Sequence, residues 1–241
     1  MIVVQSVVFH CPMLGSNILD FDKHTYTDRV VTYIKKCVLD GTYKPGDKVK
    51  ELSIAQKLSI SRAPIREALQ ILIKEGLVVW TPQKGKFITE LSPKQIRDSY
   101  FTGGILEAAA VCSVIQKYTA GDIKKLEELS EKMRQISENG ESIEKIAPLD
   151  DKFHKILFSR IDNELLLEFC RRACQGISKF LLFRYWIQLY SVEEVYWRHK
   201  VIIDALKKGD VYELEGCIRN HYMDAGKRMA DICEKELMNT M

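Results

Sequence analysis

Residues 51–76 read ELSIAQKLSISRAPIREALQILIKEG, and this stretch decides the fold of the first third of the chain. Its apolar spacing predicts a short helix over about 51–58 and a second helix over about 62–75. Residues 59–61 leave a turn of three residues between the helices, and Ser61 stands where it can cap the second one. Two helices joined by such a short turn are the pattern of a helix-turn-helix.

The second predicted helix has two faces of different chemistry. One face is apolar and can pack on the preceding helices; it consists of Ile65, Ala68, Leu69, Leu72 and Ile73. Arg62, Arg66 and Gln70 form a second stripe, because each follows the last by one helical turn. The first turn of a recognition helix meets base edges in the major groove, where arginine can bind guanine bidentately. We therefore expect Ser61, Arg62 and Arg66 to contact DNA, and Gln70 to reach its backbone.

Two short β-type runs follow, LVVW at 77–80 and KFITEL at 86–91. The residues between them predict a hairpin turn in which Gly85 adopts a positive φ. Lys84, Gly85 and Lys86 then lie at the tip, where two ammonium groups and a backbone amide can approach a phosphate or the minor groove. A solvated amphipathic helix explains any one of these features, but their order favours a winged helix-turn-helix that binds double-stranded DNA.

The chain changes character after Leu91. Ser92-Pro93 predicts a helix N-cap followed by proline at the first helical position. Helical patterns then recur at about 93–118, 122–138, 142–160, 163–189, 192–208 and 211–236. We expect a mainly α protein in three parts: a disordered N-terminal extension at 1–20, the winged helix-turn-helix at 21–91 and an all-helical domain at 92–241.

Charge and composition fit this division. The 241 residues carry a formal net charge of +3, too small to indicate a nucleic-acid partner by itself. Residues 1–90, however, hold 13 basic and 9 acidic side chains, so the positive excess lies in the expected DNA-binding part. Seven cysteines without paired short spacing fit a reducing cytoplasm. Because no apolar run reaches the roughly 18 residues of a membrane span, we expect a cytoplasmic protein without a membrane partner.

Three of the five histidines lie in predicted helices of the second domain: His154, His199 and His221. Asp150 precedes His154 by four residues, so the two side chains share one helix face. Three helices could bring one carboxylate and three imidazoles to one divalent ion, and this donor set suits Zn, Ni, Mn or Fe. Two positions of an octahedral ion would remain for a carboxylate-bearing small molecule. The plainer interpretation, a surface Asp–His contact and separate core histidines, stays open on spacing alone.

Both halves of the chain resemble the GntR family of bacterial regulators, and the second half resembles its FadR-type subfamily with an FCD sensor domain. The N-terminal resemblance is carried by Pro45-Gly46, Ala55, Ser61–Leu69 and Glu75–Leu77. The C-terminal resemblance is carried by Leu149–His154, Asn163, Leu165, Leu166, His199–Asp210 and His221.

The resemblance implies that Arg62 and Arg66 contact operator DNA, with Gly85 at the wing. It also implies an antiparallel helical bundle with a central cavity. The family's metal-ligand positions correspond to Asp150, His154, His199 and His221. We expect a homodimer, because one recognition helix reads too few base pairs. We also expect a small-molecule effector, a carboxylate, that enters the cavity and changes operator affinity.

One departure concerns the first sensor helix. The family often has an arginine four residues before Glu107, whereas this chain has Gly103, followed by Gly104. Adjacent glycines cost a helix roughly 1 kcal/mol each relative to alanine, and they can kink it. If the missing arginine touches an effector, another cation must replace it, and Arg184 is the candidate.

Two other interpretations compete with a regulator. The chain could be a metal-dependent enzyme that uses the Asp/His site, with the N-terminal domain as an accessory. Against this, the sequence shows no carboxylates paired as acid and base and no nucleophile beside a base, so we expect no enzymatic activity. Alternatively, the metal could be structural or absent, and the helical domain could serve for dimerisation alone.

Overall fold

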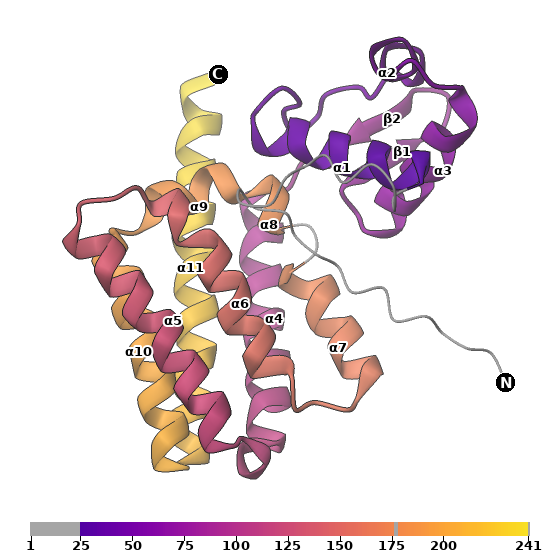
Figure 1. The fold of residues 1–241 in the computed structure, drawn as a ribbon. Helices are drawn as coiled ribbons and strands as arrows, with labels where there is room; N and C mark the ends of the chain where they lie inside the picture. Colours follow the sequence, from indigo (N-terminus) through magenta and orange to yellow (C-terminus); the bar gives the residue numbers. More distant parts are fainter. Residues whose placement is uncertain (1–24, 176–177, 241) are drawn as a thin grey trace, which may run out of the picture.

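The structure, a computed structural model, describes residues 25–175 and 178–240, so the expected extension at 1–20 lies outside the described residues. The first part of the chain contains α1 (Tyr26–Leu39), α2 (Glu51–Leu58), α3 (Arg62–Lys74), β1 (Val78–Thr81) and β2 (Gly85–Ile88). The second part contains α4 (Pro93–Ser113), α5 (Ala120–Glu138), α6 (Ala147–Phe158), α7 (Glu164–Cys170), α8 (Ser178–Leu181), α9 (Phe183–Leu189), α10 (Val192–Lys208) and α11 (Val211–Thr240). The predicted fold, mainly α with an N-terminal winged helix-turn-helix and a C-terminal helical bundle, is confirmed (Figure 1).

Buried side chains of α1 and α3 form the core of the winged helix-turn-helix. Val30 and Ile34 of α1 are fully buried, as are three residues of α3, Ile65, Leu69 and Leu72. These α3 residues belong to the predicted apolar face. Because that face is committed to the core, the stripe that carries the arginines is left outside.

The β1–β2 hairpin completes this part of the chain. Its antiparallel register pairs Val78 with Ile88. In the turn, Gly85 has a φ of 114°, as expected, and Gln83 also has a positive φ of 62°. The second strand was predicted at 86–91, but it begins at Gly85 and ends at Ile88. It is shorter because the residues after Ile88 already lead into the N-cap of α4.

The helices α4 and α11 form the spine of the bundle and lie side by side in Figure 1. Gly103 and Gly104 are buried in α4, which nevertheless continues unbroken through both glycines. A Cβ on Gly104 would lie 3.0 Å from the Cβ of Tyr222 on α11. The missing side chain therefore allows the two helices to approach closely.

The predicted helix over 163–189 is wrong as a single element. The structure divides it into α7, a π-helical segment at Arg171–Gln175, α8 and α9. The reason is tertiary, because successive parts of this stretch pack on different partners: α7 on α4, α8 on α1 and α9 on α11. One straight helix could not follow these three surfaces, so the stretch is divided into separate elements.

Candidate functional site

The exposed side of α3 carries the predicted DNA-contacting arginines, and one carboxylate connects them to the wing. Arg62 Nη2 donates to Glu51 Oε2 at 3.0 Å, and Arg66 Nε donates to the same oxygen at 3.2 Å. Lys86 Nζ on β2 donates to Glu51 Oε1 at 2.9 Å. These contacts lower the pKa of Glu51 to about 2, and the hydrogen bond from Lys86 is the largest cause. The helices α2 and α3 and the wing therefore meet at one ionised carboxylate.

The other predicted DNA-contacting residues surround this cluster. Ser61 occupies the N-cap position of α3 without a side-chain capping hydrogen bond, and Gln70 is exposed farther along the same helix. Lys84 is exposed in the hairpin turn beside Gly85. Their contacts with DNA stay predictions. Glu51 was not predicted from the sequence, although its place in the first turn of the helix that precedes the recognition helix was an available signal.

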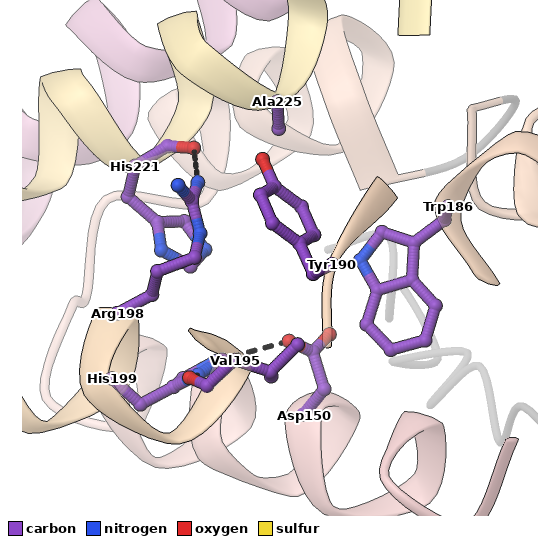
Figure 2. Close-up of a pocket in the computed structure, with 8 residues that line it drawn as sticks. All are labelled: Asp150, Trp186, Tyr190, Val195, Arg198, His199, His221 and Ala225. Atoms are coloured by element: carbon purple, nitrogen blue, oxygen red, sulfur yellow. Dashed lines mark hydrogen bonds and ion pairs between the residues drawn. The ribbon is translucent and has the colours of Figure 1, made fainter. Parts of the chain in front are cut away.

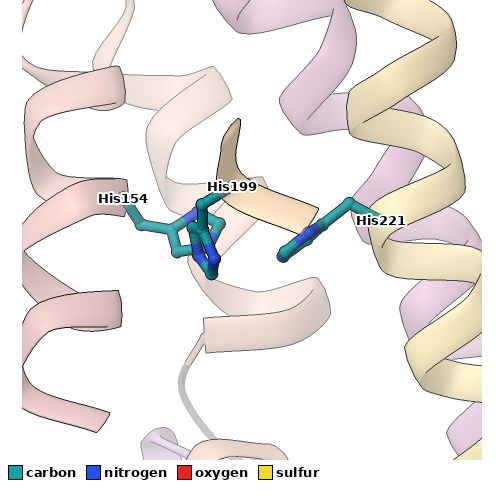
Figure 3. Close-up of side chains that lie close together, drawn as sticks. All are labelled: His154, His199 and His221. Carbon is teal, nitrogen blue, oxygen red and sulfur yellow. The ribbon is translucent and has the colours of Figure 1, made fainter. Parts of the chain in front are cut away.

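The three histidines of the bundle converge from different helices. His154 comes from α6, His199 from α10 and His221 from α11 (Figure 3). Each offers a ring nitrogen, and these nitrogens lie within 4.8 Å of one another. Asp150 Oδ1 lies 3.0 Å from His199 Nε2 and 3.9 Å from His154 Nε2. The four residues predicted as metal ligands are thus brought together.

The chemistry of this cluster fits a divalent cation. Within the described residues, buried His221 Nδ1 has no hydrogen-bond partner, and buried His199 Nε2 has only its ion-pair contact with Asp150 Oδ1. A buried polar atom left in this state costs about 1–3 kcal/mol. Burial lowers the pKa of His221 well below its usual value, and Arg198 and the neighbouring histidines lower it further. His221 is therefore neutral, which leaves a nitrogen lone pair available for a metal.

Neighbouring groups orient two of the rings. His199 Nδ1 lies 2.8 Å from Val195 O, so it donates a hydrogen bond there and turns Nε2 toward the cluster. His154 Nδ1 lies 3.2 Å from the Tyr222 hydroxyl and 3.9 Å from Glu107 Oε2. Such contacts on the far nitrogen fix the tautomer and orientation of metal-binding histidines. The contact of Tyr222 with His154 depends on packing between helices and could not be predicted from spacing, whereas Val195 lies one turn before His199 on the same helix, which was an available signal.

A small cavity with a volume of about 20 Å³ opens beside the histidines (Figure 2). Its lining residues are Asp150, Trp186, Tyr190, Val195, Arg198, His199, His221 and Ala225. Arg198 donates to Asp224 Oδ2 and to His221 O, each at 2.5 Å, and its guanidinium lies 4.3 Å from the Tyr190 ring centroid. Arg198 was not predicted from the sequence, although its place directly before His199 was an available signal.

Arg184, the cation predicted for effector binding, lies elsewhere on α9. Its Nη2 donates to Glu236 Oε2 at 3.0 Å, and the Tyr185 hydroxyl donates to the same oxygen at 2.8 Å. These hydrogen bonds join α9 to the C-terminal part of α11. It is not among the described residues that line the cavity, whereas Arg198 is.

Both parts of this chain match families of known proteins. Residues 26–88 match the family described as bacterial regulatory proteins, gntR family, and residues 98–224 match the FCD domain. The chain is 30% identical to the uncharacterised HTH-type transcriptional regulator YdhC of Bacillus subtilis over 188 residues, which cover 78% of this chain and 84% of the relative. It is 32% identical to the Nta operon transcriptional regulator of Aminobacter aminovorans over 165 residues, covering 68% and 75%.

The fold agrees with these matches. The solved structure of Escherichia coli McbR superposes with a TM-score of 0.68 and 22% identity, covering 89% of this chain and 99% of that chain. Along residues 25–175 and 178–240, no helix combines the length and the hydropathy needed to cross a bilayer. The chain belongs to the GntR family of bacterial transcription regulators, with an N-terminal DNA-binding domain and a C-terminal FCD domain.

Proposed function

We propose that this regulator acts in the cytoplasm and binds a divalent metal ion and a small carboxylate in its FCD cavity. Binding there sets its affinity for operator DNA. The observation that carries the proposal is the convergence of three imidazoles, whose ring nitrogens lie within 4.8 Å of one another, beside a cavity with an arginine in its wall. A cation and a neighbouring guanidinium together make a site for an anion.

The ion would be held by Asp150, His154, His199 and His221. Nitrogen and carboxylate donors suit Zn, Ni, Mn or Fe. When bound, the ion would supply a positive charge that attracts a carboxylate. The protein's own contribution is orientation: Val195 O fixes the His199 ring, and the Tyr222 hydroxyl fixes the His154 ring.

Arg198 supports a carboxylate as the charged group of the effector. Its side chain is 16% exposed, and Asp224 and Tyr190 hold it in place. A guanidinium that is already ordered loses little conformational freedom when a ligand arrives. Figure 2 shows Arg198 and Trp186 on opposite sides of the space. A small carboxylate with a short apolar body would match this pair.

The path from the cavity to the DNA-binding domain is short. Trp186 lies on α9, and α9 follows α8, which packs on α1. At this contact Lys35 Nζ of α1 lies 5.2 Å from the Phe180 ring centroid of α8. The same Lys35 Nζ lies 2.8 Å from Glu75, the C-cap residue of recognition helix α3. A shift of α9 would therefore reach α3 through few contacts, which supports control of operator affinity from the cavity.

A homodimer is supported by an apolar face on the bundle. Phe101 and Ile105 lie one turn apart on α4, Leu165 and Phe169 lie one turn apart on α7, and all four are exposed. The two helices that carry these residues pack on each other. Soluble proteins rarely leave such a surface uncovered, and a second copy of the chain is the expected partner.

Operator binding by the full-length protein tests the proposal. DNA fragments from upstream of the regulator's own gene are titrated by fluorescence anisotropy at stated salt, because affinity for DNA depends on salt. Arg62→Ala serves as the control that removes base contacts. Each titration is repeated with chelator, with each candidate metal, and with metal plus a panel of carboxylates. A metal-dependent shift in operator affinity with one carboxylate is the expected result.

Other outcomes would select the alternatives. Metal binding without any effect of carboxylates on operator affinity would indicate a structural ion and a sensor that serves for dimerisation. Turnover of a substrate that depends on Asp150 and metal, with no operator selectivity across the fragments, would favour a metal-dependent enzyme.

A further inference from the structure

The cluster around Glu51 is more organised than a basic surface patch. The Glu51 side chain is 18% exposed, whereas the Arg62 and Arg66 side chains are 54% and 62% exposed. The carboxylate therefore lies beneath two arginines whose outer parts face solvent. A negative charge at this place weakens the attraction for DNA phosphates, so its role requires another explanation.

The hydrogen bonds leave the base-reading groups of the arginines available. Arg66 donates to Glu51 through Nε, so this contact does not use its terminal Nη pair. Arg62 donates through Nη2 and keeps Nε and Nη1 outside the contact. A guanidinium recognises guanine O6 and N7 with two of its five N–H donors. Glu51 can therefore restrain both side chains without occupying all of their donors.

The same carboxylate fixes the wing. Lys86 Nζ donates to Glu51 Oε1, and Lys86 is paired across the hairpin with Trp80, which is exposed. A two-stranded hairpin has little rigidity by itself. The bond from Lys86 to the first turn of α2 therefore sets the position of the wing relative to α3.

We propose that Glu51 is a positioning residue for operator recognition: its carboxylate joins Arg62, Arg66 and Lys86 into one unit that meets DNA in a fixed geometry. Ordering long side chains before binding reduces the conformational entropy lost on the correct sequence. The inference rests on the family's DNA binding and on the proposed base contacts of the two arginines. It predicts that Glu51 contributes to selectivity while opposing non-specific attraction.

The test compares two DNA fragments of equal length, the operator and a scrambled sequence, with the full-length protein at several salt concentrations. Glu51→Gln keeps the shape of the side chain and removes its charge. We expect operator affinity to fall about tenfold, while affinity for scrambled DNA is unchanged or rises, because one negative charge has been removed. Glu67→Gln is the matched control, since Glu67 also lies in this domain but its Oε2 accepts a hydrogen bond from Thr27 Oγ1 at 2.8 Å. It should leave the ratio of the two affinities within about twofold.

Glu51→Asp separates geometry from charge. The charge stays, but the side chain is one methylene shorter and cannot span all three cations, so we expect the affinity ratio to fall here as well. A parallel change for both DNA fragments in Glu51→Gln, or wild-type selectivity in Glu51→Asp, would overturn the inference. If Glu51→Gln does not melt cooperatively, and so is not properly folded, the affinity ratio of Glu51→Asp is used to test the inference. Arg62→Ala separates a failure of the Glu51 inference from a failure of the proposed base contacts. If Arg62→Ala binds the operator as tightly as wild type, the base contacts themselves are refuted.

Discussion

Gly226 of α11 lies directly against Tyr100 of α4, so closely that a Cβ on the glycine would overlap the Cβ of the tyrosine. Both atoms are attached to the backbone, so no side-chain rotation relieves the clash. Gly226→Ala must therefore push α4 and α11 apart, and such overpacking costs about 1–3 kcal/mol. We expect a lower melting temperature and a lower free energy of unfolding in urea.

Gly216 provides the matched control on the same helix. Apart from Gly216 itself, its two chain neighbours and the nearby backbone of its own helix, no described atom lies within 4 Å of the Cβ position at Gly216. Alanine is favoured over glycine in a helix by about 1 kcal/mol, so Gly216→Ala should stabilise the protein. Destabilisation of similar size in both variants would contradict the close packing of α4 on α11.

The metal site can be tested through stability, without reference to DNA. Adding Zn²⁺ to chelator-treated protein should raise the melting temperature, because an ion that binds the folded state stabilises it. Asp150→Asn should weaken Zn²⁺ binding at least tenfold by calorimetry, since it removes a charged ligand (an order-of-magnitude expectation). Asp151→Asn is the neighbouring control, because Asp151 pairs with Lys155 at 2.8 Å instead. Equal affinities for Zn²⁺ in the two variants would exclude Asp150 as a ligand.

Acid stability should depend on Asp122 at the start of α5. Asp122 Oδ1 and Oδ2 accept from Arg160, each at 2.9 Å, and Oδ2 accepts from Thr119 N at 2.9 Å. These contacts, with the backbone hydrogen bond of Thr119 as the largest cause, lower the pKa of Asp122 to about 2. The pKa is about 3.9 in the unfolded chain. The stabilisation is therefore complete above about pH 4 and is lost as the pH falls toward 2.

The corresponding variant is Asp122→Asn. At pH 7 it should lower the free energy of unfolding by about 1–2 kcal/mol, because it removes the charge of the carboxylate that accepts these hydrogen bonds. Urea unfolding measured between pH 7 and pH 2 should show the difference from wild type shrinking below about pH 4. A difference that stays constant over this range would exclude an ionised Asp122 as its source.

Helical periodicity predicted the parts of the site that are local. Arg62 and Arg66 follow from one stripe of one helix, and the pairing of Asp150 with His154 follows from one helical turn. Glu51 and Arg198 could not be predicted in the same way. The role of Glu51 depends on the angle at which α2 meets α3 and the wing, and that of Arg198 on how α10 packs on α11. The unpredicted breaks within 163–189 have the same origin in contacts between distant segments.

Dimerisation should depend on the apolar face of α4 and α7. Phe101→Glu places a charge on this face, and we expect a monomer by light scattering at concentrations where wild type is a dimer, because an unpaired charge opposes burial. Val201→Glu is the control, since Val201 is similarly exposed, at 47% against 46%, but lies on α10. Operator affinity should fall with Phe101→Glu alone, because one recognition helix reads too few base pairs. A monomeric Val201→Glu with a dimeric Phe101→Glu would move the interface to α10.

The contact between Lys35 and Phe180 should carry the effector signal. Lys35→Met removes the ammonium group that lies 5.2 Å from the Phe180 ring centroid and 2.8 Å from Glu75. Lys36→Met makes the same charge change at the next, exposed position of α1, so both variants lose the same long-range attraction for DNA. Allosteric coupling is typically 5–150-fold in affinity. We expect the carboxylate that shifts wild-type operator binding to keep its effect in Lys36→Met and to lose most of it in Lys35→Met. Equal responses in the two variants would place the signal path outside the α8–α1 contact.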